Sequence, residues 1–464
     1  MAVHDVLRLL GTVPAYRNRV AHVEITEPTL PIYGELCKPL SPALEGFLHQ
    51  NNIRLYCHQC EAINSASSGK NVILTTPTAS GKSLAFNLPV FDMLETDPDG
   101  HALYLYPTKA LANDQLSPLE QISRFTGIES HAAIYDGDTP QSRRAAIREK
   151  SRIVLSNPYE LHQMLCWHTK WRPFLAGLRY IIIDEAHRHR GVFGSHIGFV
   201  IRRLLRICRH YGSNPRFILS TATLANPREF AHNLTGQDFV CIGDDGSPHG
   251  RKHMVLYNPF INGIGETSAH QETKDLLVSC VKEGLQTLCF TSSRKMAELI
   301  TLWSREDIRL TSARLADSVS VYRAGFLPEE RRSIERQLKD GTMKGVVSTN
   351  ALELGIDVGS LDAVIISGFP GTMMSTRQQA GRAGRKGSDA LAILVAQANP
   401  LDQYFMHHPD RFFSRSHENA IIDPKNPYIV SGHLLCAAAE LPVNDMTDRE
   451  FFGDSMDEDR KSVV

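Results

Sequence analysis

Short apolar runs alternate with longer amphipathic stretches through most of the chain. In the first half, β-rich apolar runs that end in turn or polar residues lie at 71–77, 101–107, 152–158, 180–185 and 216–221. In the second half, comparable runs lie at 287–292, 345–350, 363–368 and 391–396. Apolar residues recur at helical spacing between several of them, as in 293–303. Strands that alternate with helices predict parallel sheets covered by helices.

The pattern therefore predicts an α/β protein with two tandem parallel-sheet domains. A length of 464 residues also favours two or three domains. Residues 242–270 are rich in Gly, Pro, Asn and His, which is typical of a linker. The predicted order is an N-terminal extension (1–52), a first domain (53–241), the linker (242–270), a second domain (271–420) and a helical C-terminal region (421–464).

Composition narrows the class of protein. The formal net charge is −1, which excludes a wholly basic nucleic-acid binder but allows a local basic groove. No apolar stretch approaches the roughly 20 residues of a membrane span, and the start lacks a signal-peptide core. We therefore expect a cytoplasmic protein, associated with the nucleoid if it is bacterial. The CHQC run at 57–60 lacks a second Cys or His pair, so we interpret its thiols as reduced rather than zinc-bound.

A phosphate-binding loop is indicated by TPTASGKS at 76–83, which follows an apolar strand and precedes a helical stretch. Backbone N–H groups at a helix N-terminus can wrap phosphates. Lys82 is expected to reach the β- and γ-phosphates, and Ser83 to bind Mg²⁺. Thr76 stands where such loops usually carry their first glycine. The other residues predicted to line the nucleotide here are Thr78, Ala79, Ser80 and Gly81.

A carboxylate pair completes the chemistry of an ATPase. Asp184 and Glu185 belong to DEAH at 184–187, directly after an apolar strand. Asp184 is predicted to hold Mg²⁺, and Glu185 to polarise the attacking water. An acidic pair at the tip of a buried strand, about 100 residues after a phosphate loop, is far less common than one on a solvated surface. The cofactors predicted from the two motifs are ATP and Mg²⁺.

These motifs, in this order, resemble a DEAD/DEAH-type superfamily 2 helicase with two RecA-like domains. LYCHQ at 55–59 resembles the adenine-reading motif, which implies that Gln59 contacts the base edge and that Tyr56 packs nearby. PTKALANDQ at 107–115 and SNPYELH at 156–162 resemble motifs that grip the nucleic-acid strand. TAT at 221–223 resembles the motif that couples hydrolysis to domain movement, with Thr221 in place of the usual serine.

The second domain carries the remaining motifs of this family. FTSSRKMAE at 290–298, STNALELGIDVG at 348–359 and QQAGRAGRKG at 378–387 resemble motifs IV, V and VI. The resemblance implies that Gly355 and Asp357 contact the nucleotide from this domain and that Gln378 acts with two arginines. Arg382 and Arg385 are three residues apart, so on one helical face both could point into a cleft as arginine fingers. The resulting hypothesis is a motor in which ATP closes a cleft between the domains and hydrolysis reopens it.

Grip on nucleic acid should come mainly from sugar-phosphate contacts, which carry no sequence information. The candidates are Lys109, Asn157, Arg294 and Thr349. Two other features are ambiguous in the sequence. Arg202, Arg203, Arg206 and Arg209 are expected on a solvated helix face, with a nucleic-acid groove as the alternative. Trp167 and Trp171 are expected to pack, with base stacking as the alternative.

Three longer segments narrow the resemblance. Residues 184–204, 322–338 and 402–413 resemble a DNA-repair helicase group of the MrfA and fungal Hrq type. That resemblance implies 3′→5′ translocation on single-stranded or tailed duplex DNA in DNA repair. The group continues with a winged helix and a four-cysteine zinc region, which we expect to be missing after residue 464. Two alternatives stay open: an RNA helicase, and a nucleic-acid-binding subunit that needs a partner, such as a nuclease or the missing C-terminal domain, for unwinding.

Overall fold

The computed structural model describes residues 2–77, 79–261, 268–323, 325–353, 359, 361–384, 388–414, 418–453 and 456. The chain forms two compact units, and each contains one terminal segment that is remote in sequence from the rest of that unit. The unit that we call the first lobe comprises Ile32–Gly246 with Glu418–Val464, and the second lobe comprises Met1–Pro31 with Ser247–His417. Thus the N-terminal segment folds with the later half of the chain, and the C-terminal segment folds with the earlier half.

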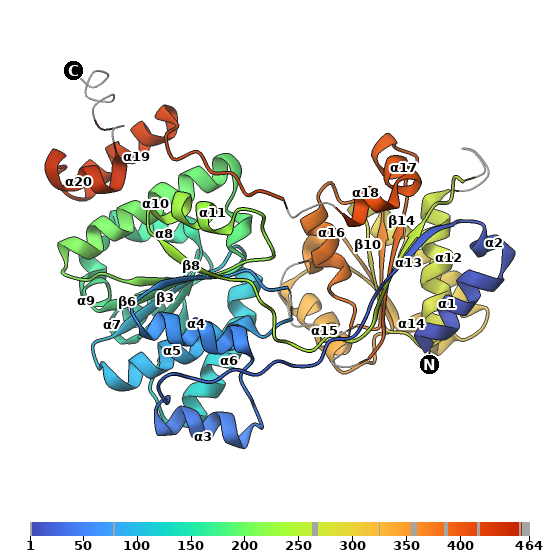
Figure 1. The fold of residues 1–464 in the computed structure, drawn as a ribbon, viewed down its shortest axis with the longest axis horizontal. Coiled ribbons are helices and arrows are strands. Elements are labelled where there is room, and N and C mark those ends of the chain that lie inside the picture. Colours follow the sequence, from blue (N-terminus) through green and yellow to red (C-terminus); the bar gives the residue numbers. More distant parts are fainter. Residues whose placement is uncertain are drawn as a thin grey trace. The chain divides into compact units, whose positions relative to one another are not determined.

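The first lobe is built on a seven-stranded parallel sheet in the order β4-β5-β3-β6-β7-β2-β8. Helices cover both faces of this sheet (Figure 1). Alternate strand residues face opposite ways, so Val72 and Leu74 join the same hydrophobic core on one face of the sheet. The strands are β2 (Asn71–Leu74), β3 (His101–Leu105), β4 (Ala133–Ile134), β5 (Ile153–Ser156), β6 (Leu178–Ile183), β7 (Arg216–Ser220) and β8 (Phe239–Ile242).

The helices of the first lobe form two layers (Figure 1). One layer contains α3 (Pro42–Gln50), α4 (Cys57–Ser67), α5 (Lys82–Thr96) and α6 (Lys109–Thr126). The other contains α8 (Pro158–Cys166), α10 (Gly191–His210) and α11 (Pro227–Thr235). Two further helices are α7 (Gln141–Lys150) and α9 (Arg172–Ala176), and the C-terminal helices α19 (Pro427–Glu440) and α20 (Asp445–Phe452) pack on α10.

The second lobe has a seven-stranded sheet in the order β1-β9-β14-β13-β10-β12-β11. Its strands are parallel except β1, which pairs antiparallel with β9. They are β1 (Val20–Thr26), β9 (Lys252–Tyr257), β10 (Thr287–Phe290), β11 (Val319–Tyr322), β12 (Gly345–Ser348), β13 (Ala363–Ser367) and β14 (Ala390–Val395). The helices are α1 (Ala2–Thr12), α2 (Pro14–Arg17), α12 (Ala269–Lys282), α13 (Arg294–Arg309), α14 (Ala313–Asp317), α15 (Pro328–Lys339), α16 (Met373–Ala380), α17 (Pro400–His407) and α18 (Pro409–Phe413).

The sequence pattern missed β1, β4, β8, β9 and β11. Strand β9 lies inside the segment that the composition marked as linker, yet it pairs with β1 on one side and β14 on the other. Its sequence KHMVLY begins with two polar residues. Strand β1 is an edge strand whose last four residues are exposed, so it carries no continuous apolar run. A strand that lacks a buried face gives little signal to hydrophobic periodicity.

The solvated face predicted for the α10 arginines is wrong for three of the four. Arg202, Arg203 and Arg206 are buried. For Arg203 and Arg206 the reason is that α19 and α20 pack over this helix and supply carboxylates and carbonyl oxygens to the guanidinium groups. Arg202 instead donates to the carbonyl oxygens of Gly198, Asn233 and Leu234. The predicted packing role holds for Trp171, which is buried against Tyr135 and Phe174, whereas Trp167 is exposed.

Candidate functional site

The topology of the first lobe gathers three motifs at one edge of its sheet. Strands β6, β7 and β2 are adjacent and parallel, so their carboxyl ends lie side by side. The phosphate loop follows β2, the DEAH residues follow β6, and TAT follows β7. Ligands in open α/β sheets bind outside the carboxyl ends of the strands. Segments far apart in the sequence thus meet at a position where this fold binds ligands.

The phosphate loop has the backbone of a phosphate cradle. Ala79 and Gly81 both adopt positive φ angles, 64° and 81°, immediately before α5 begins at Lys82. The Lys82 Nζ donates to the carbonyl oxygens of Thr76 (2.7 Å) and Pro77 (2.8 Å). Hydroxyls of Thr76 and Ser80 lie 2.7 Å apart and tie the two ends of the loop together. Ser83 is half-buried in the first turn of α5, and the predicted ligand Thr78 lies outside the described residues.

Helix α4 supports this loop from one side. The buried Gln59 accepts a hydrogen bond from the N–H of Tyr56 (2.9 Å) and donates to the Gly81 carbonyl (2.8 Å). The φ of 81° at Gly81 favours glycine, and a Cβ there would lie 2.7 Å from the Gln59 amide nitrogen, so that side chain would have to shift. Tyr56 stacks on Tyr33, with ring centroids 5.7 Å apart. Tyr33 was not predicted from the sequence as part of the site, and its side chain is 39% exposed.

The two acids after β6 are buried at the same edge. Asp184 accepts hydrogen bonds from the Ser220 hydroxyl and from the Glu185 N–H (3.0 Å). Burial, followed by the charge of Glu185, raises the pKa of Asp184 to about 6. Glu185 has a positive φ of 51°, and its Oε2 is buried with no hydrogen-bond partner among the described residues. A carboxylate held in a strained backbone conformation and left short of donors is typical of a ligand or catalytic site.

Lys82 interacts electrostatically with these acids. Burial lowers the pKa of the Lys82 ammonium, while the charges of Glu185, Asp184 and Asp245 oppose that shift. The predicted lysine and both predicted acids are therefore brought together. A phosphate chain that entered this edge would meet one cation and two anions, and the excess negative charge calls for a divalent cation.

His187 links the acids to the TAT segment. Its Nδ1 accepts the N–H of Ala222 (3.2 Å) and lies 3.3 Å from the Thr221 hydroxyl and 3.5 Å from Glu185 Oε2. The imidazole is buried. The His187 ring thus lies between the carboxylate pair and Thr221, the residue predicted to couple hydrolysis to movement. Sequence reasoning assigned His187 no role, although its place in DEAH was a signal.

In the second lobe, Glu353 organises the arginine motif. This buried carboxylate accepts hydrogen bonds from the Ser375 hydroxyl and the Gln379 amide, both 2.9 Å long. The backbone carbonyl oxygen of Glu353 accepts a hydrogen bond from Arg382 Nη2 at 2.8 Å. The predicted residue Gln378 is buried beside them on α16. Glu353 was missed because its motif had been read for Thr349, Gly355 and Asp357. Gly355, Asp357 and Arg385 lie outside the described residues.

Three of the four candidates for nucleic-acid contact share one local geometry. Asn157 caps α8 and accepts the Glu160 N–H at 3.0 Å. Lys109 and Arg294 are the first residues of α6 and α13, just after the capping residues Thr108 and Ser293. Each of these helices follows a parallel strand, so its N-terminus lies at the carboxyl edge, where N–H groups favour phosphate. Thr349 follows the end of β12 and is half-buried, and Lys109 forms an ion pair with Asp138 at 2.7 Å.

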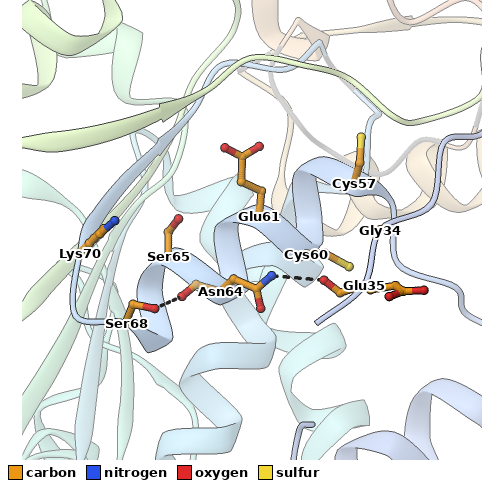
Figure 2. Close-up of a pocket in the computed structure, with 9 residues that line it drawn as sticks. All are labelled: Gly34, Glu35, Cys57, Cys60, Glu61, Asn64, Ser65, Ser68 and Lys70. Carbon is orange, nitrogen blue, oxygen red and sulfur yellow. Dashed lines mark hydrogen bonds between the residues drawn. The ribbon is translucent and has the colours of Figure 1, made fainter. Parts of the chain in front are cut away.

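A pocket of about 310 Å³ lies on the opposite flank of α4 (Figure 2). It is lined by Gly34, Glu35, Cys57, Cys60, Glu61, Asn64, Ser65, Ser68 and Lys70. None of these residues is a predicted nucleotide ligand. His58 and Gln59, which contact the phosphate loop, lie on the other face of the helix. Cys57 and Cys60 are free thiols.

The described residues contain no group of three or more His, Cys, Asp or Glu side chains placed to hold a metal ion. Within that same part of the chain, no helix is both long enough and apolar enough to cross a bilayer.

Comparison with known proteins agrees with this arrangement. Family models match residues 56–230 (DEAD/DEAH box helicase), 270–387 (helicase conserved C-terminal domain) and 422–462 (winged helix domain of the ATP-dependent helicase HRQ1). The chain is 47% identical to the uncharacterized ATP-dependent helicase YprA of Bacillus subtilis, over 86% of this chain and 53% of YprA. It is 38% identical to the ATP-dependent helicase HRQ1 of Saccharomyces cerevisiae, over 98% of this chain and 43% of HRQ1.

A solved structure gives the same result. The crystal structure of the DUF1998 helicase MrfA bound to DNA and AMPPNP superposes with a TM-score of 0.93 at 42% identity, covering 99% of this chain and 65% of MrfA. The chain spans about half the length of the curated relatives that it matches. Motif order, sheet topology and these matches lead to one conclusion: the chain belongs to the superfamily 2 DEAD/DEAH-box helicases of the MrfA/Hrq type.

Proposed function

We propose that this chain is an ATP-dependent DNA helicase or translocase. The observation that carries the proposal is the cluster of Lys82, Asp184 and Glu185 at the carboxyl edge of the first sheet. There a phosphate loop is already shaped and a buried carboxylate oxygen lacks a donor. Similarity to MrfA, whose structure was solved with DNA and AMPPNP, supports ATP as the nucleotide that is hydrolysed and DNA as the nucleic acid that is bound.

In the proposed mechanism, Lys82 leaves the carbonyl oxygens of Thr76 and Pro77 and donates to the phosphates instead. Loop N–H groups from Ala79 to Gly81 hold the same phosphates at the start of α5. Glu185 orients the attacking water and accepts its proton, which uses the carboxylate oxygen that has no donor. These groups position the reactants and stabilise charge, which is most of what phosphoryl transfer requires.

Mg²⁺ fits the donors that are present. The Ser83 hydroxyl and the Asp184 carboxylate are oxygen ligands at the loop and at the end of β6, and this hard cation prefers oxygen. When bound, it would neutralise phosphate charge. Its presence would also remove the electrostatic cost that raises the pKa of Asp184.

We infer that the second lobe contributes the transition-state cations. Arg382 and Arg385 are the proposed fingers, with Gln378, Gly355 and Asp357 contacting nucleotide or water. Support comes from the Glu353 network, which holds Arg382 through a hydrogen bond from its Nη2 to the Glu353 carbonyl oxygen. Tyr56 and Gln59 are the proposed adenine-reading residues. Gln59 already binds Gly81, so base and phosphate recognition would share one side chain.

Movement along DNA in the 3′→5′ direction and a role in DNA repair rest on resemblance to the MrfA/Hrq group. A protein partner, such as a nuclease or a further C-terminal domain, is part of the same proposal. The proposed strand contacts are Lys109, Asn157, Arg294 and Thr349. The helix N-termini that carry the first three support sugar-phosphate contacts, which do not distinguish sequences. An RNA helicase and a partner-dependent subunit are the competing functions.

The test is ATP hydrolysis by this chain with single-stranded, duplex and tailed DNA and the matching RNAs. We expect single-stranded or tailed DNA to stimulate most, and equal or greater stimulation by RNA would contradict the DNA assignment. Lys82→Ala should lower turnover at least about 10²–10³-fold, because it removes the phosphate-neutralising cation. Lys70→Ala is the matched control: this exposed lysine precedes the same strand, and its loss should leave turnover unchanged. Normal hydrolysis by Lys82→Ala would refute the phosphate-loop assignment.

A further inference from the structure

The chain passes between the lobes at two neighbouring places, which are hydrogen-bonded to each other. One passage is at Pro31–Ile32 and the other at Gly246–Ser247. Thr29 and His249 exchange two backbone hydrogen bonds (3.0 and 3.2 Å), and the Ile32 N–H donates to the Gly246 carbonyl (2.9 Å). We call these paired segments, residues 29–32 and 246–249, the crossing ribbon.

A single side chain joins the crossing ribbon to the phosphate loop. The His58 Nε2 lies 3.0 Å from the carbonyl oxygen of Ser80, and its Nδ1 accepts the Gly246 N–H at 3.2 Å. His58 is completely buried, and the adjacent Cys57 N–H donates to the Ile32 carbonyl at 2.9 Å. The imidazole is therefore hydrogen-bonded to the phosphate loop through Nε2 and to the crossing ribbon through Nδ1.

These partners fix the protonation of the ring. A carbonyl oxygen needs an N–H at Nε2, and an amide N–H needs a lone pair at Nδ1, so His58 is the neutral Nε2–H tautomer. Burial lowers the pKa of His58, and Lys82 lowers it further, against the opposing charge of Asp245, whose carboxylate is 3.8 Å from Nδ1. The ring of Tyr56 stacks alongside at 5.9 Å. Both nitrogens are thus fully used in the bridge.

We propose that His58 is a positioning residue that couples occupancy of the phosphate loop to the crossing ribbon, and so links ATP binding to the grip on DNA. This inference rests on the proposed function. Phosphates draw the N–H groups of the loop toward themselves, which moves the Ser80 carbonyl at the same time. A rigid planar ring with a partner at each end transmits that displacement to Gly246, whereas a flexible side chain with one partner would not.

Two substitutions cut the bridge at opposite ends. His58→Gln places an amide near the Nε2 position, so it keeps a donor for Ser80 and loses the acceptor for Gly246. His58→Asn places an amide oxygen near the Nδ1 position, so it keeps the acceptor for Gly246 and cannot reach Ser80. The matched control is His168→Gln, because His168 is also buried in the first lobe and also bridges two partners, Tyr211 and Glu440.

The measurement is the linkage between the two ligands. The dissociation constant of fluorescent oligothymidylate is measured by anisotropy with and without Mg²⁺ and AMPPNP, and the ratio of the two values is the coupling factor. Allosteric factors are typically about 5–150-fold. We expect the wild-type factor in that range, a fall to within about twofold of unity in both His58 variants, and the wild-type factor in His168→Gln.

Lost stability alone would weaken binding of both ligands without changing their ratio. A wild-type factor in either His58 variant, or an equal loss in His168→Gln, would therefore refute the proposal. If the wild-type chain hydrolyses ATP on DNA but has a coupling factor of one, the inference fails and the proposed function stands. If DNA does not stimulate hydrolysis at all, the proposed function fails and takes this inference with it.

Discussion

Two clusters of buried charge in the first lobe contrast in how completely they are paired. On α10, Arg203 donates to both oxygens of the buried Glu440. Arg206 donates to Asp448 and to the carbonyl oxygens of Ala437, Leu441 and Pro442. At the carboxyl edge of the same sheet, Lys82 donates to carbonyl oxygens of its own loop, and within the part of the chain that the structure describes Glu185 keeps a buried oxygen without a donor.

The difference separates charges that hold the fold from charges prepared for a ligand. A buried ion pair whose donors and acceptors are all used offers nothing to a ligand, and removing one partner leaves an expensive unpaired charge. A cluster with unused acceptors and a raised carboxyl pKa is unstable by itself and improves when a cation or phosphate arrives. The sequence has basic residues in both places, and only the pairing distinguishes them.

The largest effect should come from Glu185→Gln. The amide keeps the shape of the side chain but cannot take a proton from water, so turnover should fall about 10²–10⁴-fold while nucleotide still binds. Steady-state hydrolysis and binding of a fluorescent ATP analogue would measure the two properties. Undiminished turnover would contradict the assigned role and would place Glu185 with the structural charges.

Arg203→Met should give the next largest effect, on stability. Methionine fills part of the space but leaves Glu440 buried without its partner, which should cost about 3–5 kcal/mol in the free energy of unfolding. Urea denaturation would measure the loss.

Arg209→Ala is the control for that experiment. The Arg209–Glu450 pair is on the same helix but about half-exposed, so its loss should cost less than about 1 kcal/mol. Equal losses from the two variants would mean that burial does not set the strength of these pairs. A double variant, Arg203→Met with Glu440→Gln, should recover part of the stability, because it removes the unpaired charge.

A smaller effect is expected from pH in the ligand-free protein. The pKa of Asp184 is about 6 in the folded chain against an ordinary 3.8, so the ionised carboxyl destabilises the fold above pH 6. Protonation relieves this cost as the pH falls through 6. Asp184→Asn should therefore be more stable than wild type at pH 7.5, by on the order of 2 kcal/mol, and the advantage should shrink by pH 5. If the difference in melting temperature between Asp184→Asn and wild type does not change with pH, the prediction is wrong, and the charge of Asp184 is fully compensated in the folded chain.

Much of the site was predictable because the family's motifs stand where buried strands end. Hydrophobic runs located β2, β6 and β7, and the polar residues after each run were the ones that the sheet brings together. Spacing along the chain could not show His58, His187 or Glu353 as connectors. Each of them acts through a partner more than 20 residues away, or through the backbone of another motif.

The exchange of chain ends was not predictable for a related reason. Periodicity reports whether a segment has a buried face, but not which sheet supplies the cover. The arginines of α10 looked solvated because their partners, Glu440 and Asp448, lie more than 230 residues later in the chain. Strand β1 looked like an extension because its partner β9 is equally remote.

That exchange has a consequence during synthesis on the ribosome. The edge strand Val20–Thr26 is synthesised long before Lys252–Tyr257, the strand with which it pairs. The sheet that begins with Asn71–Leu74 closes early, yet Arg203 and Arg206 stay without carboxylate partners until residues 440 and 448 have been translated. Neither lobe can be completed by the nascent chain in order of synthesis, so a chaperone or a slow folding phase is expected to bridge the interval.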